Sequence, residues 1–315
     1  MSNPVSSTTH ESEWSFAAAW GGKGFVTDLD GPVHWIDFGG PEDGTPLVFV
    51  HGLGGSHLNW TLIGQAMTEG RRAVALDLRG FGLTPGTRQT TTVQANARLL
   101  DRFLREVIGT PAILVGNSMG GMISVLHTHT APETVAALVL IDPALPVPRR
   151  LPDPGVAATF LVYAVPGVGE FSMRTLQARL SPAEVVGRVI KLCFADPDRA
   201  DPHLLAASAA LVEGRRAIPR KEEAFLGAAR SLMRVLAKPD RYVSAMNGID
   251  VPVLLIHGEE DRLVPVAAAR KASATNPSWK KAFLAGVGHT PQLEAPEQTA
   301  KIITEWLRST AIARF

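Results

Sequence analysis

The chain has 315 residues, a net charge of +1 and 45% hydrophobic residues. This composition is typical of a soluble globular protein with a full core, and the near-neutral charge gives no electrostatic reason to expect nucleic-acid binding. The length fits one α/β domain with a sizeable insertion rather than two unrelated domains. The single cysteine, Cys193, excludes an internal disulfide and is expected to be a buried structural thiol.

Residues 1–14 are polar and rich in serine and threonine, so we expect a loosely attached tail. They lack the basic segment and following apolar segment of a secretory signal. No segment reaches the roughly 20 apolar residues that span a bilayer. The longest candidate, 156–168, is interrupted by Pro166 and Gly167. We therefore expect a cytoplasmic protein without a transmembrane segment.

The first half of the chain alternates apolar runs with amphipathic segments. Residues 24–38 are predicted to form a β-hairpin that turns at Asp30 and Gly31. Apolar runs at 46–50, 111–115 and 137–141 predict buried strands. Before the second of these runs, apolar residues recur at the spacing of an α-helix, at Val93, Ala97, Leu100, Leu104 and Val107. The alternation predicts an α/β fold with a mostly parallel central sheet and helices on both faces.

Residues 116–120 read G-N-S-M-G and lie between an apolar run and a predicted helix. The spacing G-x-S-x-G in this context is typical of a nucleophile elbow, a sharp strand–turn–helix turn with serine at its apex. Gly116 and Gly120 would let the strand and the helix approach each other there. The helix N-terminus would favour developing negative charge. The motif therefore predicts Ser118 as a nucleophile.

A serine nucleophile needs a base, and the base needs an acid that orients it. Asp261 follows an apolar strand in a G-x-x-D-x-x-V-P segment, and His289 opens a G-H-x-P-x-x-E-x-P-E segment. The predicted triad is therefore Ser118, Asp261 and His289. Asp142 also follows a strand and remains the alternative acid, although Asp142 and Pro143 can also form a simple loop start.

These motifs resemble those of the α/β-hydrolase superfamily, and the resemblance extends from about Phe25 to about Leu307. Residues 51–56, H-G-L-G-G-S, resemble the family loop that lies beside the serine. The resemblance implies an oxyanion hole formed by the backbone N–H groups of Leu53 and Met119. Residues 77–82, D-L-R-G-F-G, resemble a family turn that we interpret as structural.

The strand–helix alternation breaks after Pro143, and helical segments punctuated by proline follow as far as about Gly248. The family places a helical cap at this point, and such a cap would exclude water and form the substrate pocket. The sequence therefore predicts four segments. These are a polar tail at 1–20, a core at 21–142 and 249–315, and a cap at 143–248.

An apolar stretch of the predicted cap, residues 157–163, has two interpretations that stay open. It can line an acyl pocket, with Phe160, Leu161 and Tyr163 as the candidate lining residues, or it can pack the cap onto the core. Peripheral contact of this stretch with a lipid surface is a third interpretation.

We expect neither a metal nor a cofactor. His127 and His129 lie two positions apart on a predicted helix and therefore point in different directions. His51, at the end of a strand, is expected to be a structural hydrogen-bonding residue. No H-E-x-x-H motif or Cys/His ligand spacing occurs in the sequence.

The resemblance implies hydrolysis of a small-molecule carboxylic ester with a small to medium apolar acyl group, through an acyl-enzyme. A carbon–carbon bond hydrolase of ring-cleavage products on the same triad remains an alternative, because residues 116–121 resemble the elbow of those enzymes. A catalytically silent ligand-binding protein is a second alternative, although such proteins typically lose a triad member and none is missing here. The sequence leaves the oligomeric state open.

Overall fold

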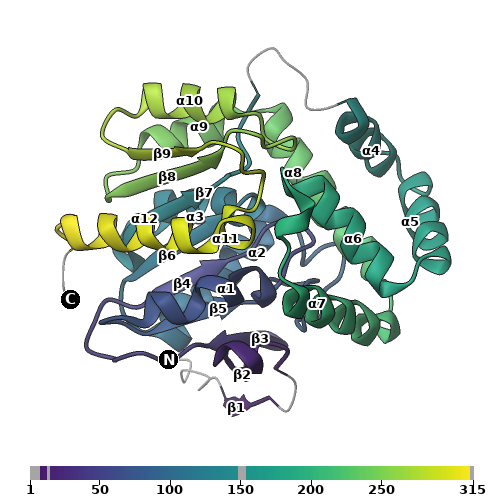
Figure 1. The fold of residues 1–315 in the computed structure, drawn as a ribbon, viewed down its shortest axis with the longest axis horizontal. Helices are drawn as coiled ribbons and strands as arrows, with labels where there is room; N and C mark the ends of the chain where they lie inside the picture. The colour runs from purple at the N-terminus through teal and green to yellow at the C-terminus, as the bar shows by residue number, and fades with distance from the viewer. Residues whose placement is uncertain (1–7, 13–14, 148–153, 313–315) are drawn as a thin grey trace, which may run out of the picture.

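The computed structural model describes residues 8–12, 15–147 and 154–312. In this part of the chain a nine-stranded sheet has the order β1-β2-β3-β5-β4-β6-β7-β8-β9, with helices on both of its faces (Figure 1). The strands are β1 (Thr9–Glu11), β2 (Lys23–Asp28), β3 (Pro32–Asp37), β4 (Leu47–Val50), β5 (Ala73–Leu76), β6 (Ala112–Asn117), β7 (Val135–Ile141), β8 (Val253–Gly258) and β9 (Lys280–Leu284).

The helices alternate with the strands of the core and then follow one another without strands. The α-helices are α1 (Thr61–Gly64), α2 (Val93–Phe103), α3 (Met119–Thr130), α4 (Pro154–Ala164), α5 (Val168–Arg179), α6 (Pro182–Cys193), α7 (Pro202–Gly214), α8 (Lys221–Ala237), α9 (Asp240–Asn247), α10 (Val266–Thr275), α11 (Pro291–Glu294) and α12 (Pro296–Ser309). Shorter helical turns are η1 (Ala18–Trp20), η2 (His57–Trp60), η3 (Gln65–Thr68), the π-helical η4 (Leu104–Ile108), η5 (Pro132–Thr134), η6 (Pro197–Arg199) and η7 (Arg215–Ala217).

The sheet is mostly parallel, as predicted. β1, β2 and β3 pair antiparallel and β3 joins β5 antiparallel, whereas the strands from β5 through β9 pair in parallel. The predicted hairpin forms from β2 and β3. Its turn residues Asp30 and Gly31 have positive φ angles of 62° and 105°, which suit an aspartate and a glycine.

Part of the N-terminal segment belongs to the sheet. Thr9–Glu11 pair with β2, and the hydroxyls of Thr9 and Thr27 lie 2.8 Å apart. Ala17 is fully buried. The expectation of a loosely attached tail is therefore wrong for residues 9–11, which form an edge strand of the sheet, and the segment 1–20 that we expected to be a polar tail contains a buried apolar side chain.

Each face of the sheet has its own apolar core. On one face, Leu100 and Phe103 of α2 and Met122 of α3 pack against the strands. On the other face, Ile63 of α1 and Ile303 of α12 pack against them. Because helices cover both faces, the parallel strands β4 to β8 are buried along their whole length.

Between β7 and β8 the described residues are helical and contain no strand, as the sequence predicted. Helices α4 to α8 lie together on one side of the core, at the right in Figure 1. Helix α9 instead packs against α3, with Tyr242 buried in the core, so the core resumes before residue 248. None of the helices in the described ranges is long and apolar enough to cross a membrane.

Candidate active site

Ser118 lies at the apex of the turn between β6 and α3, with φ 54° and ψ −118°. A non-glycine residue in this region of backbone space carries strain of order 1–3 kcal/mol, which the surrounding structure must hold in place. A Cβ on Gly116 would lie 2.7 Å from Gly121, and a Cβ on Gly120 would overlap the Val50 carbonyl. The glycines around Ser118 therefore allow the close strand–helix approach that the motif predicted.

The loop after β4 runs beside this serine. A Cβ on Gly52 would lie 3.0 Å from the Cβ of Ser118. His51 fixes the loop, because its Nδ1 lies 2.8 Å from the Gly52 carbonyl and its Nε2 accepts from the Leu78 N–H at 3.0 Å. Burial lowers the pKa of His51 to about 4, so the ring is neutral and structural.

Two backbone N–H groups, one in the loop after β4 and one directly after Ser118, are the candidate oxyanion donors. In the described part of the chain, neither the Leu53 nor the Met119 N–H donates a backbone hydrogen bond. Met119 is the first residue of α3, so its N–H also lies at the positive end of the helix dipole. These are the two groups that the resemblance implied for an oxyanion hole.

The His289 ring is paired with Asp261: its Nδ1 lies 2.7 Å from Oδ2 of Asp261. The other carboxylate oxygen, Oδ1, accepts the N–H groups of Leu263 at 2.7 Å and Val264 at 3.0 Å. Burial by itself would raise the pKa of Asp261, but the charge and hydrogen bond of His289 outweigh it, and the pKa lies below its usual range. Asp261 is therefore a charged acceptor, and Nδ1 of His289 carries a proton.

The His289 loop is tied to the nucleophile elbow and to the cap. The side-chain amide of Asn117 donates to the His289 carbonyl at 3.1 Å, which joins the loop to the residue before Ser118. The His289 N–H donates to the Cys193 carbonyl at the end of α6, at 2.6 Å. Burial raises the pKa of the Cys193 thiol to about 12, so this cysteine is protonated and suits a structural role.

A second connection between cap and His289 loop runs through Glu294, which the sequence motif contained but which we did not single out. Its side chain is buried and accepts the N–H groups of Gly288 at 2.7 Å, Ala195 at 3.1 Å and Asp196 at 2.8 Å. One carboxylate thus holds the residue before His289 and two residues after α6. The spacing of the G-H-x-P-x-x-E motif was the available signal.

Asp142, the alternative acid, lies beside Asp261 rather than beside His289. Its Oδ1 accepts the Gly258 N–H at 3.0 Å, and its side chain is fully buried. Burial, together with the neighbouring charge of Asp261, raises the pKa of Asp142 well above its usual range. The structure thus brings both candidate acids together and pairs His289 with Asp261.

The candidate pocket residues on the cap lie in different surroundings. Tyr163 packs against Phe225 with ring centroids 5.6 Å apart, and Phe225 lies over the loop after β4, where a Cβ on Gly54 would approach it to 3.2 Å. Leu161 is 70% exposed on the outside of α4, so we propose no pocket role for it. The side chain of Phe160 lies outside the described residues. No local pattern in the sequence had indicated Phe225.

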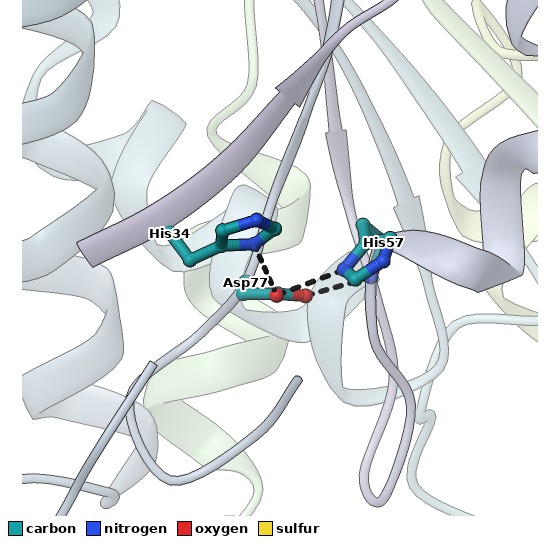
Figure 2. A group of neighbouring side chains, drawn as sticks. All are labelled: His34, His57 and Asp77. Atoms are coloured by element: carbon teal, nitrogen blue, oxygen red, sulfur yellow. Dashed lines mark hydrogen bonds and ion pairs between the residues drawn. The ribbon is translucent and has the colours of Figure 1, made fainter. Parts of the chain in front are cut away.

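A second buried cluster lies at the end of β5 (Figure 2). Oδ2 of Asp77 lies 2.8 Å from Nδ1 of His34 and 2.9 Å from Nδ1 of His57. The same oxygen accepts the backbone N–H of Leu83, and Oδ1 of Asp77 accepts the backbone N–H of His57. A Cβ on Gly82 would overlap the Asp77 carboxylate. Since both Nδ1 atoms face a carboxylate at hydrogen-bond distance, they carry protons and offer no lone pair to a metal. The cluster fits the structural role expected of the D-x-R-G-x-G turn.

Comparison with known proteins places this chain in a family. The model of the alpha/beta hydrolase family matches residues 47–302. The chain therefore belongs to the alpha/beta hydrolase family. The match includes the serine elbow, the acid loop, the histidine loop and the helical segments between β7 and β8.

Relatives of this chain carry out more than one kind of reaction. The dihydrolipoyllysine-residue acetyltransferase component of the acetoin cleaving system of Pseudomonas putida is 29% identical over 88% of this chain, and the match spans 66% of that protein. The pimeloyl-[acyl-carrier protein] methyl ester esterase of Aromatoleum aromaticum is 29% identical over 83% of this chain and 98% of its own length. A thermophilic esterase from Thermogutta terrifontis shares the fold, with a TM-score of 0.67 at 22% identity over 90% of this chain and 96% of that one.

Proposed function

We propose that the protein is a serine hydrolase that cleaves carboxylic esters through an acyl-enzyme. The observation that carries the proposal is the 2.7 Å pairing of His289 Nδ1 with Asp261 in a loop tied by Asn117 to the elbow of Ser118. A buried carboxylate fixes the imidazole tautomer with its proton on Nδ1, which leaves Nε2 able to accept the serine proton. Ester hydrolysis is also the activity named for the Aromatoleum relative.

In the first half of the reaction Ser118 Oγ attacks the ester carbonyl carbon, and His289 Nε2 accepts the hydroxyl proton. The carbonyl oxygen becomes an oxyanion that the Leu53 and Met119 N–H groups stabilise. The carbon–oxygen bond to the alcohol then breaks, and His289 returns the proton to the leaving alkoxide. Asp261 stabilises the imidazolium that exists between these two proton transfers.

In the second half, water attacks the acyl group on Ser118. His289 takes a proton from the water and gives it to Ser118 Oγ as the ester bond to the enzyme breaks. The products are the free carboxylic acid and the regenerated enzyme. No step needs an electron acceptor or a cofactor, because the chemistry is proton transfer and acyl transfer alone.

The substrate class that we propose is a small-molecule ester with a small to medium apolar acyl group. Phe225 lies over Gly54 of the loop that contains Leu53, Tyr163 packs against Phe225, and Leu53 and Phe225 pack against the same core. Ser118 is only 9% exposed, so access to the nucleophile is restricted. An apolar acyl group gains free energy by leaving water for such surroundings.

The test is a graded panel of simple esters with the wild type, Ser118→Ala and Ser124→Ala. Ser124 is a matched control, since it is a buried serine on the same helix whose hydroxyl donates to the Gly120 carbonyl. We expect Ser118→Ala to lose turnover of every ester and Ser124→Ala to keep it. Absence of ester turnover by the wild type, with rapid cleavage of a vinylogous ring-cleavage diketone, would replace this proposal with the carbon–carbon hydrolase.

A further inference from the structure

Asp142 and Asp261 form a pair of buried carboxyl groups, although only one acid is needed for a triad. Asp142 follows β7 and Asp261 follows β8, and the two strands are neighbours in the sheet. The two carboxyl groups lie close together: one oxygen of each and one ring nitrogen of His257 all lie within 4.8 Å of one another. Two ionised carboxylates can only accept hydrogen bonds, so a hydrogen bond between these two groups requires a proton on one of them.

The surrounding donors decide which carboxyl group holds the proton. Asp261 accepts three N–H groups, from Leu263, Val264 and His289. Asp142 accepts only one N–H group, from Gly258. Among the described residues no N–H or O–H group donates to its other oxygen, Oδ2. The negative charge is most stable where most donors point, so Asp261 is ionised and Asp142 is neutral.

The other groups that face Asp142 give the same assignment. Nε2 of His257 lies 3.5 Å from Oδ1 of Asp142, but it lies only 2.8 Å from the Val264 carbonyl and donates its proton there. Burial lowers the pKa of His257, so this ring is neutral. Glu294 adds negative charge nearby, and no lysine or arginine in the described ranges pairs with either aspartate. A second charge here would be buried without compensation.

We propose that Asp142 is a positioning residue for Asp261: its carboxyl group stays protonated at neutral pH and donates a hydrogen bond to the Asp261 carboxylate. This inference rests on the proposed triad. With His289 on one side and Asp142 on the other, the Asp261 carboxylate keeps one orientation while His289 gains and loses its proton. The cluster then carries a single negative charge, which the imidazolium neutralises during the reaction.

Asparagine at position 142 should reproduce the protonated aspartate. Its Oδ1 can accept from Gly258 and its Nδ2 can donate to Asp261. Asp142 has a φ of 42°, a left-handed conformation that asparagine tolerates as well as aspartate does. Alanine at the same position removes both the donor and the acceptor. The pair Asp142→Asn and Asp142→Ala therefore compares a variant that keeps the hydrogen bond with one that loses it.

The experiment has two readouts. The first does not depend on enzyme activity, and the second can be measured without knowing the natural substrate. Infrared spectroscopy at pH 7 detects the C=O stretch of a protonated carboxyl group, and the difference between wild type and Asp142→Asn assigns it. The rate of fluorophosphonate labelling, measured across pH on samples whose folded fraction is known from circular dichroism, reports the activation of Ser118.

We expect a protonated-carboxyl band in the wild type that Asp142→Asn lacks. We also expect Asp142→Ala to label about tenfold more slowly or worse, as for loss of a hydrogen bond to a charged group. Asp142→Asn should restore the labelling rate to within about threefold of the wild type, with the acid limb of its pH–rate profile unmoved.

Three results would overturn the inference. Absence of the band, or an acid limb that moves to lower pH in Asp142→Asn, would mean that Asp142 is ionised. Full labelling speed in Asp142→Ala would mean that Asp142 does not position Asp261. A loss of about a thousandfold in Asp142→Asn would make Asp142 the triad acid. If the wild type is not labelled, the proposed function fails instead, and the infrared band still decides the protonation of Asp142.

Discussion

Two buried clusters in this molecule contain the same chemical groups and differ in what surrounds them. In one, Asp77 accepts Nδ1 of His34 and of His57; in the other, Asp261 accepts Nδ1 of His289. Both carboxylates also accept two backbone N–H groups, and both have pKa values below their usual range, since the imidazoles outweigh the effect of burial. An aspartate–histidine pair is therefore not by itself evidence of catalysis.

The difference lies in where each imidazole is attached. His34 belongs to β3 and His57 to η2, so the Asp77 cluster joins a strand, a helical turn and the glycine-rich turn after β5 (Figure 2). His289 lies on a loop tied by Asn117 to the nucleophile elbow, and its partner Asp261 has a second carboxyl group beside it. We therefore assign the first cluster to the scaffold, and we propose that the second moves a proton beside Ser118.

The largest effect that separates the clusters is expected at Asp261. Asp261→Asn should lower kcat by about 10³–10⁴-fold, because the amide favours the wrong tautomer of His289. The stability of the fold should change much less than the activity does. Turnover of the best ester from the panel, together with a urea denaturation curve, measures both. A variant that keeps most of its turnover would show that another group orients His289.

Asp77→Asn should have the opposite signature. Removing a buried carboxylate that binds two imidazoles should cost about 3–5 kcal/mol of the free energy of unfolding. Urea denaturation measures this loss, and kcat per folded molecule should stay within about tenfold of the wild type. Should Asp77→Asn instead lose turnover like Asp261→Asn while keeping its stability, the distinction between the two clusters would collapse.

Glu294 should give an intermediate result, because it supports the reactive cluster without touching the substrate. In Glu294→Gln an amide N–H group faces backbone N–H groups, so at least one of the bonds to Gly288, Ala195 and Asp196 is lost. We expect a loss of about 1–3 kcal/mol in the free energy of unfolding, with roughly a tenfold fall in kcat/KM. Glu297→Gln, an exposed change in the same motif, is the matched control and should match the wild type in both measurements.

The sequence was sufficient to predict the features that depend on short, contiguous segments of the chain. Ser118, Asp261 and His289 lie in short motifs directly after apolar strands, so the sequence was sufficient to predict the turn at Ser118 and the pairing of Asp261 with His289. Likewise the parallel sheet follows from buried strands that alternate with helices.

Contacts between distant segments were not predictable in the same way. Phe225 reaches Gly54, Glu294 binds the segment after α6, and Asp142 lies beside Asp261 only after the cap and core have folded. No periodicity or spacing encodes these contacts. The same reason explains why the pocket role expected for Leu161 was not met. Its side chain is apolar, as in a pocket, but it lies on the outer surface of α4.

The smallest expected effect concerns the acyl group. Burial against Phe225 and Tyr163 should contribute about 0.8 kcal/mol per methylene, so kcat/KM should rise by up to about fourfold per carbon until the pocket is full. Activity should then fall, which gives an optimum chain length. Phe225→Ala should flatten this series. A flat series in the wild type would contradict an apolar acyl pocket beside the oxyanion loop.

The central claim is that Ser118 is the covalent nucleophile, and intact-mass analysis after reaction with a fluorophosphonate tests it most directly. We expect one adduct per chain in the wild type and in Ser124→Ala, mapped by peptide sequencing to Ser118, and no adduct in Ser118→Ala. Full labelling of Ser118→Ala, or an adduct on another residue of the wild type, would contradict the account.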